Sequence, residues 1–111
     1  MVEALWSVEF KSNLQMIGSG IVVLETGRVF GGDSGMIYIG SYKVVGDKIK
    51  AILRIQRYAN VPGMVSVTGL DDYELELEGK VDPKHIVLQG RVVGAPHLQM
   101  SVHGVRRADL P

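Results

Sequence analysis

Apolar and polar residues alternate along most of this chain, and glycine-bearing turns divide the alternation into short segments. In residues 5–11 the even positions are apolar, and the odd positions from Ser7 onward are polar. In residues 48–56 the odd positions are apolar, while the even positions are Lys, Arg or Gln, with Ile52 the one exception. A two-residue period is typical of a β-strand with one buried face.

The same reasoning predicts strands at residues 20–25, 28–31, 36–45, 73–78, 85–93 and 98–103. Thr26-Gly27 is predicted to form a tight hairpin turn, because glycine adopts positive φ without steric cost. Residues 59–70 contain Pro62, Gly63 and Gly69 and are predicted to be the longest irregular connection. No segment has a convincing helical period.

These segments predict an all-β protein: one antiparallel up-and-down barrel of about eight strands, since closure removes exposed strand edges. The glycines at positions 40, 90 and 104 suit the bends of barrel strands. A chain of 111 residues forms one domain, residues 1–111. A barrel of about this size encloses its own side chains or one small ligand. The predicted cavity lining is Trp6, Phe10, Leu53, Ile55, Leu75 and Met100.

Composition limits the functional classes. Twelve acidic residues balance twelve basic ones, and the pI is near 6.8, so direct nucleic-acid binding is not expected. The chain has no cysteine, which excludes a disulfide framework and a thiolate metal site. The N-terminal residues lack a signal-peptide pattern, and no apolar run is long enough to span a bilayer. We therefore expect a cytoplasmic protein without membrane contact.

The reactive side chains form no recognisable catalytic set. Two of the three histidines (His85, His97 and His103) flank the last predicted hairpin and could form a metal pair, but no third ligand follows at a recognisable spacing. The serines lack the context of a nucleophile elbow. The sequence thus predicts no catalytic residue, no metal and no cofactor, and a protein that is not an enzyme.

An acidic stripe at Glu74, Glu76 and Glu78 has two interpretations. With Asp71 and Asp72, Glu74 and Glu76 could form a docking surface for a basic protein partner. Alternatively, the stripe pairs with the basic face of residues 48–56, with Glu76 opposite Arg54 and Glu74 opposite Gln56.

Several short motifs occur in the order and approximate spacing of a known family. They are Ala-Leu-Trp-Ser-Val-Glu-Phe-Lys-Ser-Asn at 4–13, Gly-Ser-Gly-Ile-Val-Val at 18–23, Gly-Gly-Asp at 31–33, Tyr-Ile-Gly at 38–40, Arg-Tyr at 57–58 and Asp-Tyr-Glu-Leu at 72–75. In these motifs the chain resembles the GrlR family of negative regulators of type III secretion gene expression, over about residues 3–107.

The resemblance implies a lipocalin-type, calycin-like barrel. It also implies a homodimer that represses by sequestering a helix-turn-helix transcriptional activator, without touching DNA. The founding member has an acidic Glu-Asp-Glu-Asp loop that is implicated in partner contact. Here the matching connection is Val45-Gly46-Asp47-Lys48, so the partner contact does not transfer residue by residue.

The resemblance to calycins also predicts how one end of the barrel closes. Calycins place a tryptophan of the first strand, within Gly-x-Trp, against a basic residue of the last strand. Here the motif is Ala4-Leu5-Trp6, and Arg106-Arg107 lies near the C-terminus. We expect Trp6 to be buried and stacked by one of these arginines.

A second functional class stays open beside the regulator. Calycin barrels often carry small apolar ligands, and the predicted interior is apolar enough for a lipid. The same residues would equally suit a filled core.

Overall fold

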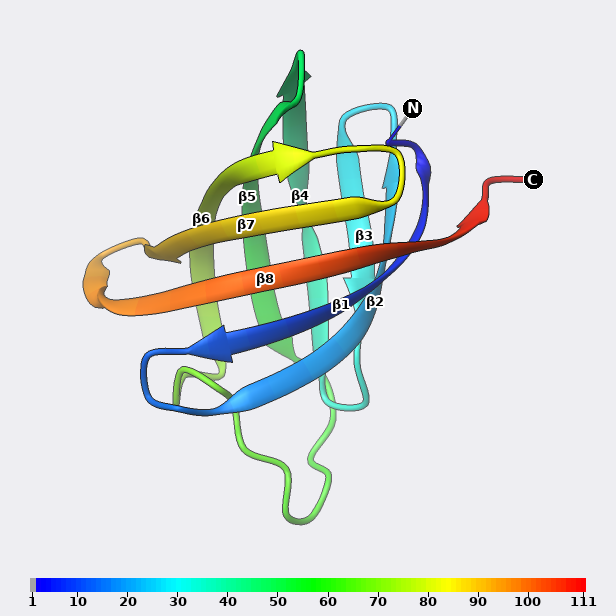
Figure 1. Ribbon diagram of the computed structural model, residues 1–111. Helices are drawn as coiled ribbons and strands as arrows, with labels where there is room; N and C mark the ends of the chain where they lie inside the picture. The colour runs from blue at the N-terminus through cyan, green and yellow to red at the C-terminus, as the bar shows by residue number, and fades with distance from the viewer. Residues whose placement is uncertain (1) are drawn as a thin grey trace.

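The protein is an eight-stranded antiparallel barrel. The computed structural model describes residues 2–111, and the regular structure in that range consists of eight strands (Figure 1). The strands are β1 (Ala4–Ser12), β2 (Ile17–Glu25), β3 (Arg28–Gly32), β4 (Met36–Val45), β5 (Lys48–Arg57), β6 (Asp72–Val81), β7 (His85–Val92) and β8 (Ala95–Asp109). Within residues 2–111, no helix is long and apolar enough to cross a membrane.

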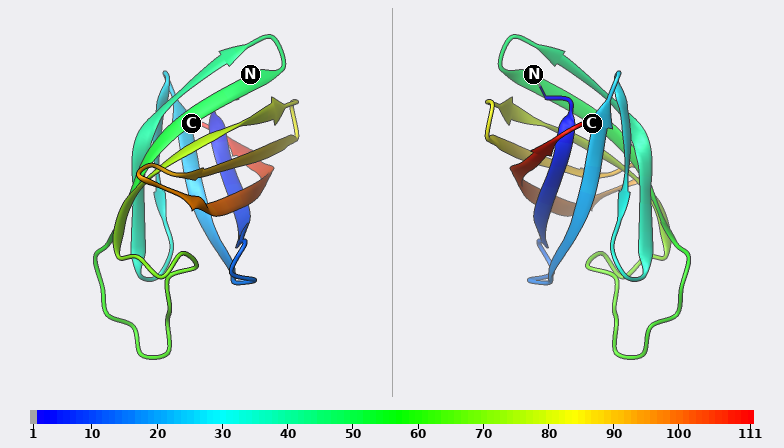
Figure 2. Two further views of the ribbon diagram at one scale, coloured as in Figure 1. Left: turned by 90° about the vertical axis from the view of Figure 1, so that its left-hand side faces the viewer. Right: turned by 90° about the vertical axis from the view of Figure 1, so that its right-hand side faces the viewer.

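The strands follow one another around the barrel in chain order, and β1 closes it by pairing with β8. The predicted up-and-down barrel is thereby confirmed. Residues 58–71 contain no strand and form the longest connection, as predicted. Figure 1 shows β7 and β8 crossing in front of β4 and β5 at a steep angle. Figure 2 shows that the β4–β5 hairpin and the 58–71 connection project from opposite ends of the barrel.

The alternation along β5 and β8 places the predicted side chains inside. Ile49, Ala51 and Ile55 are buried and Leu53 is half-buried, while Lys48, Lys50 and Arg54 are exposed. On β8 Met100 is buried, and Leu98 and Val102 pack against the core. Each strand therefore directs one face into a common apolar interior.

Inward-facing glycines allow the strands to bend sharply across one another. Gly90 lies between the buried residues Leu88 and Val92 of β7. A Cβ atom at Gly90 would lie 1.7 Å from the backbone oxygen of Glu76 on β6. Gly40 of β4 approaches the carbonyl of Ile52 on β5 in the same way, at 1.9 Å. Any larger residue at these positions would force the paired strands apart.

Trp6 and Arg106 close one end of the barrel, as predicted. Trp6 is completely buried, and its Nε1 donates to the carbonyl of Val2 at 2.9 Å. The guanidinium carbon of Arg106 lies 5.9 Å from the centroid of the indole ring, within the range of a cation–π contact. A register shift in the β1–β8 pairing places Arg106 opposite Trp6.

The turns agree with the local sequence, but the predicted register between β5 and β6 is wrong. Thr26 and Gly27 have φ values of 51° and 79°, as the predicted tight turn requires. The β5–β6 register places Arg54 opposite Glu74, so neither predicted pair occurs. Glu76 lies opposite Ile52, and Gln56 lies opposite Asp72. In a tight hairpin the turn fixes the register. Because β5 and β6 are joined by the long 58–71 connection, the sequence contains no such turn to predict their register from.

The close approach at Gly90 predicts a strong effect of one methyl group. Gly90→Ala should lower the free energy of unfolding by about 1–3 kcal/mol or more, because the new Cβ would collide with the β6 backbone. Gly104→Ala is the matched control, since a Cβ there meets its nearest atoms at an ordinary 3.5 Å. It should be neutral or stabilise by up to about 1 kcal/mol. Urea denaturation of both variants measures the difference, and equal effects would refute this account of the bends.

Candidate functional site: an apolar cavity and two outer surfaces

The barrel contains a cavity of about 230 Å³. Five of the six predicted lining residues do line it: Phe10, Leu53, Ile55, Leu75 and Met100. The sixth prediction is wrong, because Trp6 is not among the lining residues. Its side chain is used to close the opposite end of the barrel through the contact with Arg106.

Several inward-facing side chains are only half-buried because they border this space. Leu53 and Val102 point inward on their strands, pack against the core and line the cavity. Phe10 is also half-buried, and its ring meets Tyr38 edge-on at 6.1 Å between centroids. The interior is therefore apolar without being completely filled.

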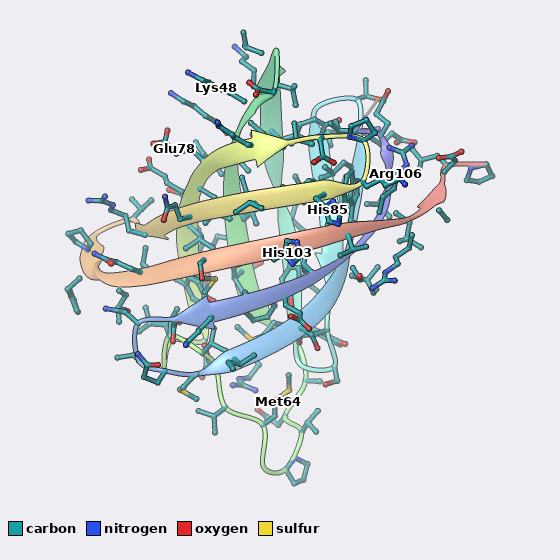
Figure 3. All side chains as sticks on the ribbon, viewed as in Figure 1. Lys48, Met64, Glu78, His85, His103 and Arg106 are labelled. Carbon is teal, nitrogen blue, oxygen red and sulfur yellow. The ribbon has the colours of Figure 1, made fainter. Side chains whose placement is uncertain are left out.

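The 58–71 connection covers one end of the cavity. Met64, Val65, Ser66 and Val67 of this connection all line the cavity. The sulfur of Met64 lies 3.6 Å from the hydroxyl of Ser34 in the β3–β4 turn. Figure 3 shows Met64 at this end of the molecule, away from Arg106.

Asp33 organises a polar cluster at the covered end. One oxygen of its carboxylate accepts hydrogen bonds from the backbone N–H groups of Gly35 and Met36, at 2.9 and 2.8 Å. The other oxygen accepts a hydrogen bond from the hydroxyl of Tyr38. The pKa of Tyr38 is strongly raised. The main cause is burial of the hydroxyl, and the hydrogen bond to Asp33 and the negative charge of that carboxylate add to it. Tyr38 is thus held as a neutral donor to a fixed carboxylate.

A second tyrosine joins the cluster from β6. Burial raises the pKa of Tyr73, and the nearby hydroxyls of Thr68 and Ser66 in the covering connection oppose this shift. The hydroxyls of Ser66 and Thr68 are themselves hydrogen-bonded to each other at 3.2 Å. Both Ser66 and Thr68 are buried. Among the described residues, every buried side-chain nitrogen or oxygen has a hydrogen-bond partner. The polar end of the cavity is therefore saturated by the protein itself.

Among residues 2–111, Arg57 is the one cationic side chain that lines the cavity. Its Nε donates to the carboxylate of Asp71 at 2.8 Å, and the side chain is 19% exposed. Its backbone N–H donates to the carbonyl of Asp71, so β5 and the residue before β6 are joined twice.

Two of the four acids of the predicted partner surface are already paired. Asp71 binds Arg57, and Asp72 accepts two hydrogen bonds from Arg54 at 2.7 and 2.9 Å. The pKa of Asp72 is lowered by these hydrogen bonds from Arg54. Glu74 and Glu76 are exposed on the outer face of β6, opposite Arg54 and Arg91 respectively. The surface therefore alternates acids with arginines and is not a uniformly acidic patch.

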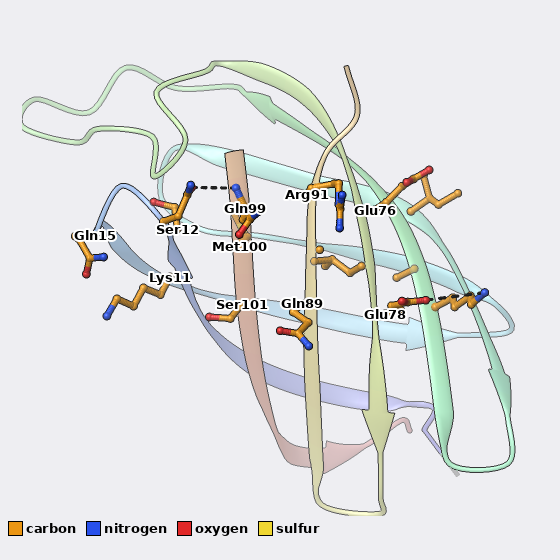
Figure 4. Close-up of a pocket in the computed structure, with 16 residues that line it drawn as sticks. Lys11, Ser12, Gln15, Glu76, Glu78, Gln89, Arg91, Gln99, Met100 and Ser101 are labelled. Atoms are coloured by element: carbon orange, nitrogen blue, oxygen red, sulfur yellow. Dashed lines mark hydrogen bonds and ion pairs between the residues drawn. The ribbon is translucent and has the colours of Figure 1, made fainter. Parts of the chain in front are cut away.

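Glu76 also borders a broad outer groove of about 920 Å³ (Figure 4). Its charged side chains have both signs: Lys11, Lys50 and Arg91 against Glu76 and Glu78. Lys50 and Glu78 approach to 4.0 Å, and both are well exposed. The uncharged lining residues are a mixture of amide and hydroxyl side chains with apolar ones, so the groove is mixed in polarity and nearly neutral.

The histidines do not form a metal centre in the part of the chain described. The rings of His85 and His103 are stacked on the outer face at 5.7 Å between centroids, with His97 elsewhere on β8 (Figure 3). Residues 2–111 contain no group of three His, Cys, Asp or Glu side chains placed to hold a metal. Asp82, 3.8 Å from His85, accepts two backbone hydrogen bonds that lower its pKa.

An unbroken apolar row crosses the outside of four strands. The pairings join Leu5 to Val23, Val23 to Phe30, and Phe30 to Ile39. Phe30 and Ile39 are 44% and 46% exposed, whereas an outward face of a barrel is ordinarily polar. Ile21 and Ile37 extend this surface along β2 and β4. These six residues are called the outer apolar face below.

Part of the outer apolar face is visible in the sequence, whereas the polar cluster is not. The apolar stretches around Ile21 and Ile39 are visible in the sequence, since even their outward positions are aliphatic. The sequence analysis did not identify the bond between Asp33 and Tyr38, because alternation gives the face of a strand and not the partner of a polar side chain. The available signal was the Asp33-Ser-Gly turn followed by an inward-facing tyrosine.

Comparison with known proteins gives no further guide to the chemistry. No known family matches the chain, and no curated protein sequence matches it. Function is therefore argued from the cavity and the outer surfaces.

The raised pKa of Tyr38 predicts a loss of stability in alkaline solution. Free tyrosine titrates at about 10, so above this pH the unfolded chain releases a proton that the folded protein retains. The free energy of unfolding should therefore fall as pH rises past about 10. Tyr38→Phe should reduce the slope, and it should cost about 1–3 kcal/mol at neutral pH by removing the donor to Asp33.

Urea denaturation on both sides of this pH measures the effect. Tyr58→Phe is the control, because it removes a hydroxyl that is exposed and donates to the backbone of the same turn at 2.7 Å. This control should keep the decline of the unmodified protein. An unchanged slope in Tyr38→Phe would contradict the assignment.

Proposed function

We propose that this protein is a non-enzymatic regulator that acts, as a homodimer, by binding another protein. The observation that carries the proposal is the outer apolar face, defined above by Leu5, Ile21, Val23, Phe30, Ile37 and Ile39. A contiguous apolar surface of this kind is typical of a protein–protein contact.

Closure of the barrel decides how a second chain can bind. Every strand of residues 2–111 has a neighbour on both sides, and only strand ends such as residues 17–20 of β2 and 42–45 of β4 lack a partner on one side. These ends offer little edge for strand addition, so we propose that association occurs through a face. A stable interface buries about 800 Å² per partner with an apolar centre and a polar rim. The outer apolar face supplies the centre, and Arg28, 5.5 Å from the ring of Phe30, supplies part of the rim.

The resemblance to the GrlR family supports the regulatory part of the proposal. In that family the regulator sequesters a helix-turn-helix activator. The balanced charge of this chain suits contact with a protein better than contact with DNA. Glu74 and Glu76, together with the arginine-paired acids Asp71 and Asp72, are the surface proposed for a partner with a basic helix.

The partner contact proposed here differs from the acidic loop of the founding member. The matching loop is the tip of the β4–β5 hairpin, where Gly46 has a φ of 65° and Asp47 and Lys48 are exposed side by side. Opposite charges on adjacent residues give no net attraction for a basic helix. We therefore assign the contact to the outer face of β6 instead of to this hairpin.

The dimer predicts a specific effect of charge on the outer apolar face. The protein should elute at about 24 kDa by light scattering, twice the 12.1 kDa of the chain. Phe30→Glu should weaken the dimer by at least about 2 kcal/mol, because it places a charge at the centre of the interface. Size-exclusion chromatography with light scattering over a dilution series measures both values.

Val87→Glu is the matched control for this variant. Val87 is 56% exposed on β7, four strands around the barrel from β3, and lies outside the outer apolar face. The control should remain dimeric. A monomeric unmodified protein at high micromolar concentration, or equal loss in both variants, would contradict the proposed interface.

Sequestration is tested with a purified helix-turn-helix activator from the same organism and a DNA fragment that this activator binds. The activator alone should retard its promoter DNA in a gel, and added protein should abolish that shift without producing a band of its own. Glu74→Lys with Glu76→Lys should reduce the effect at least about ten-fold, which corresponds to about 1.4 kcal/mol. A shift produced by this protein alone would contradict the proposed mechanism.

A further inference from the structure

We infer that four lysines at one end of the barrel form a docking surface for a short, extended, acidic segment of another protein. They are Lys43, Lys48, Lys50 and Lys80, called the lysine cluster below. The cluster lies on and beside the β4–β5 hairpin. The proposed dimer contact is on the outer apolar face, and the proposed contact for a basic helix is on Glu74 and Glu76, so the three sites can be tested separately.

Strand pairing brings these lysines together. Lys43 of β4 lies directly opposite Lys50 of β5, and Lys48 of β5 lies directly opposite Lys80 of β6. Directly opposite side chains have their Cβ atoms about 4.5–5.5 Å apart, and alternate residues on one strand are about 6.8 Å apart. All four lysines are exposed. The cluster is therefore a two-by-two array of cationic side chains on the outer face.

This arrangement is unfavourable for the isolated chain. Like charges directly opposite each other on adjacent strands repel. Within residues 2–111, three of the four lysines take part in no ion pair, and the fourth, Lys50, approaches Glu78 only to 4.0 Å with both side chains well exposed. Four lysines against the two carboxylates of Asp47 and Glu78 leave an excess of two positive charges, in a chain whose net charge is zero. An acidic partner would relieve the repulsion.

Exposed valines lie on both sides of one lysine pair. Val45 is opposite Lys48, and Val87 is opposite Lys80, so one outer row across four strands consists of valine, lysine, lysine and valine. Val45 and Val87 are 72% and 56% exposed. Figure 3 shows Lys48 extending outward beside the hairpin. An occupant can make apolar as well as charged contacts here, which favours a segment of protein over a purely ionic ligand.

Neighbouring acids limit the length of the occupant. Glu78, Glu76 and Glu74 follow one another along the outer face of β6. A long polyanion such as a nucleic acid would extend over these carboxylates and be repelled, whereas a segment with two acids would not. Alternate side chains of an extended segment are separated by the same distance, about 6.8 Å, as Lys48 and Lys50. Carboxylates at alternate positions therefore match both lysine pairs at once.

A compact phosphate fits this surface less well. Proteins hold phosphates with free backbone N–H groups or with the planar fork of arginine. Here β5 is paired with β4 and with β6 at both Lys48 and Lys50, so its backbone is used in the sheet. The cluster contains no arginine. Separate, flexible ammonium groups suit separate carboxylates better than one compact anion.

The test uses three short peptides that differ in the number or the spacing of their acids. The first is acetyl-Val-Asp-Ser-Asp-Val-amide, the second has asparagine in place of both aspartates, and the third is acetyl-Val-Asp-Asp-Ser-Val-amide. Adjacent side chains of an extended segment point to opposite sides, so the third peptide can present only one acid to the cluster. Each peptide is titrated at low salt into the full-length, isotope-labelled protein.

Backbone amide signals in two-dimensional NMR report the binding. The first peptide should give saturable shifts at Lys43, Lys50 and Lys80. It should bind at least about ten-fold more tightly than the asparagine peptide and at least about three-fold more tightly than the peptide with adjacent acids. Raising the salt concentration to about 1 M should weaken its binding, because the screening length then falls to about 3 Å.

Two double variants with the same change in charge locate the site. Lys48→Gln with Lys80→Gln removes one lysine pair and should weaken binding of the first peptide at least about five-fold. Its midpoint of urea denaturation should not fall, because the two lysines repel each other in the unmodified protein. Lys11→Gln with Arg91→Gln removes two cations on β1 and β7, outside the cluster, and should bind the peptide as the unmodified protein does.

Four results would overturn the inference. They are the absence of saturable shifts with the first peptide, equal binding of that peptide and either of the other two, equal weakening in the two double variants, and inorganic phosphate binding at the cluster as tightly as the first peptide. The last result would make the cluster a site for a compact anion. None of them depends on the dimer or on Glu74 and Glu76, so failure here leaves the proposed function intact.

Discussion

Closure of β8 onto β1 is the constraint on which the rest of this structure depends. A meander of this length closes only if its strands bend sharply, and the bends occur where inward-facing glycines such as Gly90 and Gly40 let paired backbones approach. The Trp6–Arg106 contact fixes one end of the closed barrel. The opposite end is covered by the irregular 58–71 connection.

Closure also separates the outer faces of the strands from the apolar interior of the barrel. Because every strand of the described residues has a neighbour on both sides, we propose that binding to another chain uses an outer face. Because alternate residues face inward, the same strands that carry Phe30 and Ile39 outside carry Val29 and Tyr38 toward the interior.

The local pattern of the sequence was sufficient to predict the barrel, its main strands, the Thr26-Gly27 turn and most of the cavity lining, since each depends on alternation or turn chemistry. It placed Trp6 in the cavity wrongly, because alternation gives the face of a strand but not the depth along the barrel. It also misplaced the β5–β6 register by two residues, since Arg54 pairs with Glu74 and not Glu76. The Asp33–Tyr38 hydrogen bond was not predicted, because it depends on the turn between β3 and β4 and on side-chain direction, which periodicity does not describe.

The claim that the outer apolar face is buried between two copies of this chain is tested most directly by NMR on a mixed dimer. Half of the chains carry isotope labels and half do not, and the experiment records only nuclear Overhauser effects between the two kinds of chain. Our account predicts intermolecular contacts from the ring of Phe30 and the methyl groups of Ile39 and Ile21. Intermolecular contacts confined to β6–β8, or their absence in a sample shown to be dimeric, would contradict it.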